Sequence, residues 1–171
     1  ADGVGPLLVL EASCVVQGLA GERIIPLINF FAGPKRTVLA PDEVLVRVTM
    51  KTPSAKYGGA YFKYGRRNAM EIALLGISVY LEVADDKKTC TSMRIALGTS
   101  APTPIRIPKT EAYFIGKDLT DKDVLEKGGA FVLEEASPRS SWRAASTFRM
   151  TLLKQLVPRT IRTAYKNVFE E

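Results

Sequence analysis

Histidine is absent from all 171 residues. This absence removes the commonest general base, the Ser-His and Cys-His nucleophile pairs and most zinc sites. The only cysteines, Cys14 and Cys90, have no neighbouring cysteine with which to form a metal knuckle or a disulfide framework. We therefore expect both to be small buried residues in strands, and we do not expect catalysis that rests on this chain's side chains alone.

Long apolar runs and phosphate-cradling glycine motifs are missing as well. No apolar run approaches the roughly 18 residues that span a bilayer, and no basic segment precedes the first apolar residues. The spacings G-x-G-x-x-G and G-x-x-x-x-G-K-[ST] do not occur. With 46% hydrophobic residues, the chain can form one domain or a domain plus part of another. We expect a soluble, cytoplasmic protein without a membrane span.

Positive charge is concentrated near the C-terminus. The formal net charge is +6, and residues 139–171 hold seven Lys or Arg against two Glu, which accounts for +5 of it. Such a tail can attract nucleic acid, an anionic membrane or an acidic partner protein. The solvated polar face of a helix has the same composition, so charge alone does not choose among these readings.

Alternating apolar residues predict strands in the first part of the chain. A short helix is expected within residues 4–11, followed by strands in SCVVQG and ERIIP around the turn signal AGE. In EVLVRVTM, the face that runs from Val44 to Met50 is expected to point inward. Residues 52–59, with Pro, Ser and two glycines, predict a linker.

Beyond the linker, the pattern predicts a three-stranded antiparallel meander. Strands are expected around residues 60–65, 77–83 and 93–97, with the polar turn DDKK between the last two. Helices are expected to follow, the first of them beginning at Pro108 and running to about Phe114. The order of strands and then helices predicts an α+β fold.

Glycine and proline are expected to disturb the later helices. A cap at Thr120 or Asp121 begins one helix, which Gly128-Gly129 should loosen. The last segment carries an apolar stripe at three- and four-residue steps, with Arg149 among the cations that fall off it. Pro158 is expected to kink or restart that helix.

Aromatic and cationic residues crowd into residues 61–67. Tyr61, Phe62, Lys63, Tyr64, Arg66 and Arg67 place three rings and three cations in seven positions. A planar anionic ligand such as a flavin suits this surface, and so does a single-stranded nucleic acid. An exposed strand end with snorkelling cations is the plain structural alternative.

Five stretches carry a resemblance that spans nearly the whole chain. They are ADGVGPLLVLEASCVV, ERIIPLINFFAGPKRTVLAPDEVLVRV, AYFKYGRRNAMEIALLGISVYL, RIALGTSAPTPIR and SSWRAASTFRMTLLKQLVPR. Together and in this order they resemble the flavin subunit of the molybdenum hydroxylases, the family of xanthine dehydrogenase and carbon monoxide dehydrogenase. One departure is Ser141, where family members often carry an aspartate, which would alter a local salt bridge.

The resemblance implies a fold and a domain division. Residues 1–56 would be the C-terminal part of a vanillyl-alcohol-oxidase-type FAD-binding domain. Residues 57–171 would be the family's C-terminal domain, with a three-stranded antiparallel sheet and a helical bundle. The family's glycine-rich pyrophosphate loops would precede Ala1, so the chain resembles the latter part of a longer subunit and is not expected to hold FAD unaided.

The family's flavin contacts imply roles for five residues. Asp2 would form a hydrogen bond with the ribityl chain of the flavin or with nearby backbone, and Leu45 would make an apolar contact with the flavin. Lys63 would lie near the polar edge of the isoalloxazine, where a cation stabilises the negative charge of reduced flavin. Tyr64 would be a stacking residue and Arg67 a second cation.

The resemblance also implies an oxidoreductase that works as part of a complex. In the family, substrate is hydroxylated at a molybdopterin cofactor on a large subunit. Electrons pass through two two-iron two-sulfur clusters on a small subunit to FAD, and then to NAD, oxygen or another acceptor. This chain would be inactive alone, and it would need the N-terminal part of the flavin subunit as well as both partners. A basic nucleic-acid-binding module, and an assembly domain whose basic helix docks on the large subunit, remain alternatives.

Overall fold

The computed structural model describes residues 2–53, 56–67 and 69–170. Its elements, in chain order, are α1 (Val4–Val9), β1 (Ser13–Gly18), β2 (Gly21–Pro26), the 3-10 turn η1 (Leu27–Asn29), β3 (Phe31–Gly33), β4 (Arg36–Thr37), β5 (Val44–Thr49), β6 (Tyr57–Tyr64), β7 (Leu75–Val83), β8 (Cys90–Gly98), β9 (Ile105–Arg106), α2 (Pro108–Phe114), α3 (Lys122–Glu135) and α4 (Ser146–Asn167). Residues 54–55 of the expected linker lie outside the described residues, and its last part, from Tyr57, already belongs to β6.

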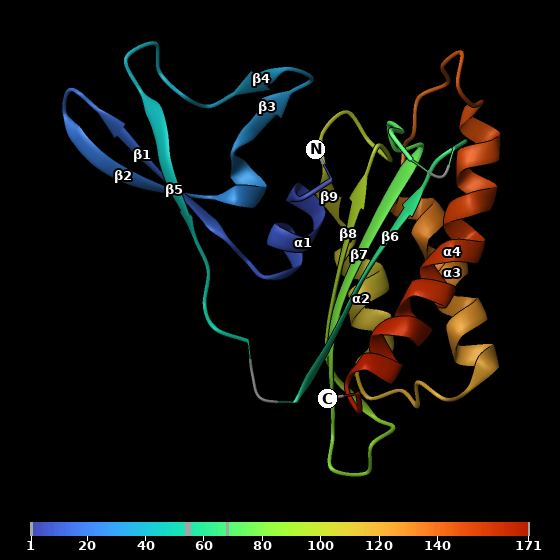
Figure 1. Ribbon diagram of the computed structural model, residues 1–171. Helices are drawn as coiled ribbons and strands as arrows, with labels where there is room; N and C mark the ends of the chain where they lie inside the picture. The colour runs from blue at the N-terminus through green and yellow to red at the C-terminus, as the bar shows by residue number, and fades with distance from the viewer. Residues whose placement is uncertain (1, 54–55, 68, 171) are drawn as a thin grey trace.

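The chain forms three layers (Figure 1). The central layer is an antiparallel sheet in the order β6-β7-β8-β9, and the outer ones are the helices and a smaller sheet in the order β2-β1-β5. Strands β6, β7 and β8 confirm the predicted meander, because each pairs antiparallel with the next strand along the chain. The fourth strand, β9, falls in a proline-rich segment that the sequence indicated only as a loop.

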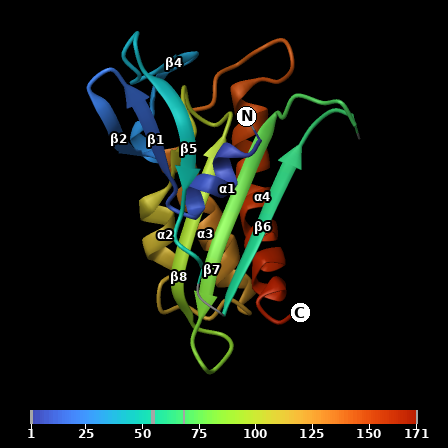
Figure 2. The same cartoon turned by 60° about the vertical axis from the view of Figure 1, so that its left-hand side comes forward.

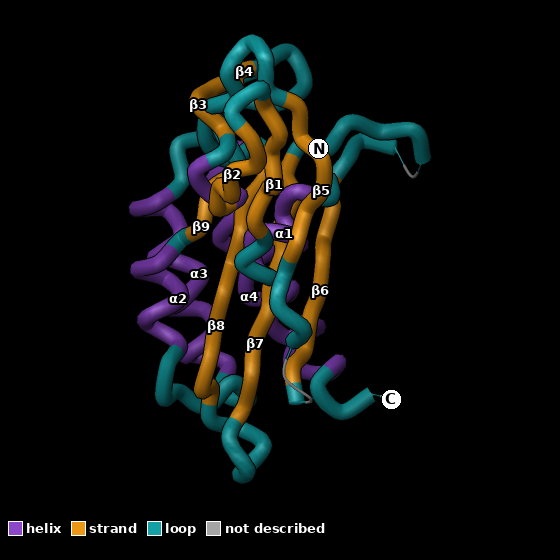
Figure 3. The backbone as a smooth tube through the Cα atoms, turned by 90° about the vertical axis from the view of Figure 1, so that its left-hand side faces the viewer, coloured by secondary structure: helices purple, strands orange, loops and turns teal. Residues whose placement is uncertain are grey.

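Each face of the central sheet is covered by a different part of the chain. Helices α2, α3 and α4 pack on one face, where Ile77, Ile95 and Leu153 are fully buried. Helix α1 lies against β7 and β8 on the other face (Figures 2 and 3). There a second core joins the N-terminal elements to Tyr80 and Ala96 of the sheet. Cys14 and Cys90 are buried and unpaired in their strands, as expected.

The glycine pair in α3 tightens the helix packing and does not loosen the helix. Gly128 and Gly129 are buried, and a β-carbon on Gly129 would lie 2.6 Å from the carbonyl oxygen of Lys154. That carbonyl lies four residues before Pro158, which has no N–H to donate to it. The Cα–H of Gly129 therefore faces an oxygen that α4 leaves without its usual helical partner. Helix α4 accordingly continues through Pro158 without a restart.

Two further expectations from the sequence are wrong. The apolar stripe of α4 predicts Arg149 on the polar side, but its side chain is buried and donates to the carbonyl oxygen of Leu74 and to Oγ of Ser141. The apolar face of β5 was expected inward, yet all of β5 is exposed in this structure. Val44 is 61% exposed and Val46 is 51% exposed, because nothing in the described part of the chain covers them.

Candidate functional site

Strand β6 sends alternate side chains to opposite faces of the central sheet. Phe62 and Tyr64 point to the helices and pack against the large core. Tyr61 and Lys63 therefore point to the face that carries the N-terminal elements. The aromatic and cationic cluster seen in the sequence is thus divided between two faces of the sheet.

Lys63 forms an ion pair with Asp2, which lies 61 positions earlier in the chain. Its Nζ lies 2.7 Å from Oδ2 of Asp2, and the two side chains are 33% and 47% exposed. The hydrogen bond from Lys63 is the main reason that the pKa of Asp2 lies below its usual value. The carboxyl is therefore ionised near neutral pH. The structure brings together two of the five residues that the resemblance singled out.

Tyr61 completes this group, and the sequence reasoning did not select it. The negative charge of the Asp2 carboxylate acts on its hydroxyl, and its ring lies beside Gly76, where a β-carbon would be 3.2 Å from the hydroxyl. Partial burial, together with the negative charge of Asp2, raises the pKa of Tyr61 to about 12. The signal that could have found it is its two-residue spacing from Lys63 on a strand.

The Tyr61 titration gives a direct test of this geometry. We expect the phenol to ionise near pH 12 in ultraviolet absorbance titrations, and Asp2→Asn to move that pKa down toward 10. Because the folded-state pKa is raised, the contribution of Tyr61 to stability is complete below pH 10 and is lost as the pH rises toward 12. An Asp2→Asn variant with an unchanged Tyr61 pKa would show that the carboxylate does not contact the phenol.

The other three predicted residues lie apart from this group. Leu45 belongs to β5 in the smaller sheet, opposite Val16, and is 40% exposed. The Tyr64 ring packs edge-on against Phe148 of α4, with 6.4 Å between ring centroids. Arg67 lies in the loop after β6, where it pairs with Glu71 at 3.1 Å and donates to the carbonyl oxygen of Met70.

The group around Lys63 fits the polar edge of a planar cofactor such as a flavin. The ammonium of Lys63 has three donors and gives one of them to Asp2. The remaining donors, the partly exposed Tyr61 ring and the Asp2 carboxylate offer a cation, an aromatic face and an acceptor together. The same donor set is unsuited to a metal, and the described residues contain no cluster of three or more His, Cys, Asp or Glu side chains that could hold one.

None of the helices described here has both the length and the apolar character needed to cross a membrane. The longest, α4, carries Arg149, Lys154, Arg159, Arg162 and Lys166 along its 22 residues.

The chain is similar to subunits of known enzyme complexes. A xanthine dehydrogenase FAD-binding subunit of Escherichia coli O157:H7 is 33% identical over 165 residues, which are 96% of this chain and 56% of that protein. A nicotine 6-hydroxylase medium subunit of Paenarthrobacter nicotinovorans is 30% identical over 157 residues, covering 91% and 53%. The chain therefore spans about half the length of the curated relatives it matches.

Solved structures agree with these relatives. A carbon monoxide dehydrogenase of Hydrogenophaga pseudoflava superimposes with a TM-score of 0.90 at 27% identity, covering 97% of this chain and 56% of that one. Quinoline 2-oxidoreductase of Pseudomonas putida 86 gives 0.89 at 25% identity, covering 98% and 57%. The family described as the CO dehydrogenase flavoprotein C-terminal domain matches residues 60–164. The chain belongs to this CO dehydrogenase flavoprotein C-terminal domain family.

Proposed function

We propose that this chain is the C-terminal part of an FAD-binding subunit in a molybdenum hydroxylase. The observation that carries the proposal is the Asp2–Lys63 ion pair with Tyr61 beside it, on the sheet face that the N-terminal elements cover. The whole protein would be an oxidoreductase, and the relatives named above are flavin or medium subunits of such enzymes. These relatives lend no support to the alternative of a nucleic-acid-binding module.

The proposal also assigns a role to each domain of this chain and to its partner chains. Residues 1–56 would close a vanillyl-alcohol-oxidase-type FAD-binding domain, and residues 57–171 would form the C-terminal domain. Partner chains would be a large subunit with the molybdopterin cofactor and a small subunit with two two-iron two-sulfur clusters. Electrons would travel from these clusters through FAD to NAD, oxygen or another acceptor.

The chain's own residues would position the flavin and tune its charge. FAD supplies the redox chemistry when it is bound. Lys63 would donate to the polar edge of the ring system and favour its negatively charged reduced form, while Asp2 orients the ammonium. Leu45 would add an apolar contact. Tyr64 and Arg67 stay predicted contacts, although the Tyr64 ring faces α4; Tyr61 shares the face of Lys63 and is the stacking residue we add.

Replacing Lys63 by methionine tests the proposal in the flavin-loaded complex that contains this chain. We expect the two-electron midpoint potential of the flavin to fall by about 30 mV or more, since the loss of roughly 1.4 kcal/mol from the reduced state corresponds to that shift. Redox titration of the flavin absorbance measures it.

Lys56→Met is the matched control. Lys56 pairs with Asp85 at 3.3 Å, and its side chain is 78% exposed, so the same change there should leave the potential unaltered. A wild-type complex without bound flavin would overturn the proposed function. An unchanged flavin midpoint potential in the Lys63→Met variant would overturn the role given to Lys63.

A further inference from the structure

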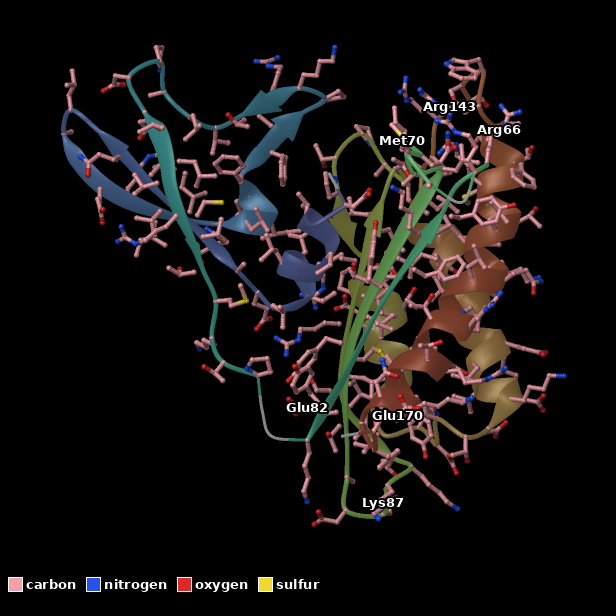
Figure 4. The ribbon with its side chains drawn as sticks, viewed as in Figure 1. Arg66, Met70, Glu82, Lys87, Arg143 and Glu170 are labelled. Carbon is pink, nitrogen blue, oxygen red and sulfur yellow. The ribbon has the colours of Figure 1, made fainter. Side chains whose placement is uncertain are left out.

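A hollow lies just beyond the C-terminal end of β6, a few residues past Lys63 in the chain. It has a volume of about 380 Å³ and is formed by the loop between β6 and β7 and by the segment before α4. Figure 4 shows Arg66 and Arg143 at the same end of the molecule, with Met70 near them. The lining residues are Arg66, Arg67, Glu71, Ile72, Trp142 and Arg143.

Positive charge in this hollow exceeds negative charge. Its one carboxylate, Glu71, accepts a hydrogen bond from the Arg67 side chain at 3.1 Å. The guanidinium groups of Arg66 and Arg143 have no carboxylate partner within residues 2–53, 56–67 and 69–170. The Arg143 guanidinium instead stacks over the Trp142 ring, 4.5 Å from its centroid.

A buried arginine that contacts Ser141, next in the chain to the lining residue Trp142, adds to the imbalance. Arg149 is 5% exposed, and its Nε has no hydrogen-bond partner in the described part of the chain. Burial, and then repulsion from Arg139 and Arg143, holds the pKa of Arg149 below its usual value. The Oγ of Ser141 accepts a hydrogen bond from Arg149 at 3.2 Å. This acceptor is neutral, whereas a buried guanidinium would be expected to have a negatively charged partner. The cluster therefore lacks an anion.

Large apolar side chains that are exposed to solvent lie among these cations. Trp142 is 79% exposed, Met70 is 95% exposed and Ile72 is 62% exposed. Exposed Trp, Met and Arg together are typical of the residues that dominate protein interfaces. A phosphate chain would leave the exposed apolar side chains around these cations without a partner.

We propose that this hollow binds an acidic segment of a partner protein. One or two carboxylates would pair with Arg66 and Arg143, and a neighbouring apolar side chain would pack on Trp142 and Ile72. The arginine fork suits bidentate pairing with a carboxylate, which gives the contact orientation as well as charge complementarity. This inference goes beyond the flavin function and does not depend on it.

Trp142 makes the proposal directly measurable, because it is the only tryptophan of the chain. Its fluorescence should change saturably on titration of the 171-residue chain with a peptide of alternating glutamate and leucine. The response should weaken as salt is added. Inorganic phosphate and a short oligothymidylate are the comparison probes. A stronger response to either of them than to the peptide would overturn the proposal.

Charge variants locate the binding. Arg66→Glu should weaken peptide binding by about tenfold or more, whereas Arg162→Glu, the same charge change on an exposed part of α4, should alter it by less than about twofold. Ser141→Asp provides a second variant that introduces a carboxylate beside Arg149 without removing a side chain from the core. It should also weaken binding, with an unchanged circular dichroism spectrum. Equal effects of Arg66→Glu and Arg162→Glu would show nonspecific attraction and reject the site.

Discussion

Replacing Glu111 by alanine is expected to lower the free energy of unfolding by about 3–5 kcal/mol. Glu111 is 8% exposed and accepts two hydrogen bonds from Arg106, at 2.5 and 2.7 Å, and one from the backbone N–H of Ile95, at 2.8 Å. Its removal leaves a largely buried guanidinium without its counter-charge and a buried N–H without an acceptor. Both changes destabilise the region where β8, β9 and α2 pack together.

Urea unfolding followed by circular dichroism measures this loss. Glu111→Gln retains an acceptor for Ile95 and should lose less. Glu22→Ala is the matched control, because Glu22 forms a similar two-bonded pair with Arg47, at 2.9 Å, on the open surface of the small sheet. Its loss should be a small fraction of that at Glu111, since exposed pairs are screened by water and salt. Similar losses at both sites would show that burial of Glu111 adds nothing to its pair.

Replacing Gly58 by alanine is also expected to have a large effect, and should lower the free energy of unfolding by about 2–3 kcal/mol. A β-carbon at Gly58 would collide with the carbonyl oxygen of Ala164 and lie 2.6 Å from a methyl group of Val168. The obstacle is the backbone of α4, so no side-chain rotation relieves it. The end of α4 would have to move off β6, and the hydrogen bond from Asn167 to the carbonyl oxygen of Gly59, at 2.8 Å, would be strained.

Hydrogen exchange separates this local effect from a general one. In Gly58→Ala, amide protection should fall most in the last two turns of α4, together with the drop in unfolding midpoint. Gly3→Ala is the control, because a β-carbon there has nothing within 4 Å and the backbone needs no positive φ. A Gly58→Ala variant as stable and as protected as Gly3→Ala would contradict the close packing of α4 on β6.

Predictions that rested on local patterns succeeded. Residue alternation located β7 and β8, Pro108 marked the start of α2, and Asp121 caps α3 by accepting from the N–H groups of residues 123 and 124. These signals are contained within a few residues of the element that they describe. The strand β9 was missed because a two-residue strand carries no alternation to detect.

Predictions that needed a neighbour from elsewhere in the chain failed or stayed open. Gly128-Gly129 suggested a loose helix because the groups that they pack against, Phe114 of α2 and the Lys154 carbonyl of α4, come from elsewhere in the chain. Arg149 fell off the apolar stripe of α4, yet the carbonyl oxygen of Leu74 lies within its reach and draws it inward. For the candidate site, the resemblance named Lys63 and Asp2 separately, and composition could not pair them or add Tyr61.

The sequence by itself determined the α+β class, the order of the longer strands and the helices, and the family, because periodicity, caps and collinear motifs are local or sequential. Only the tertiary structure decided which side chains meet. Lys63 and Asp2 are 61 positions apart, and Arg149 and Leu74 are 75 positions apart. Their contacts exist because the sheet and α4 bring distant segments within hydrogen-bond reach, a condition that no local pattern encodes.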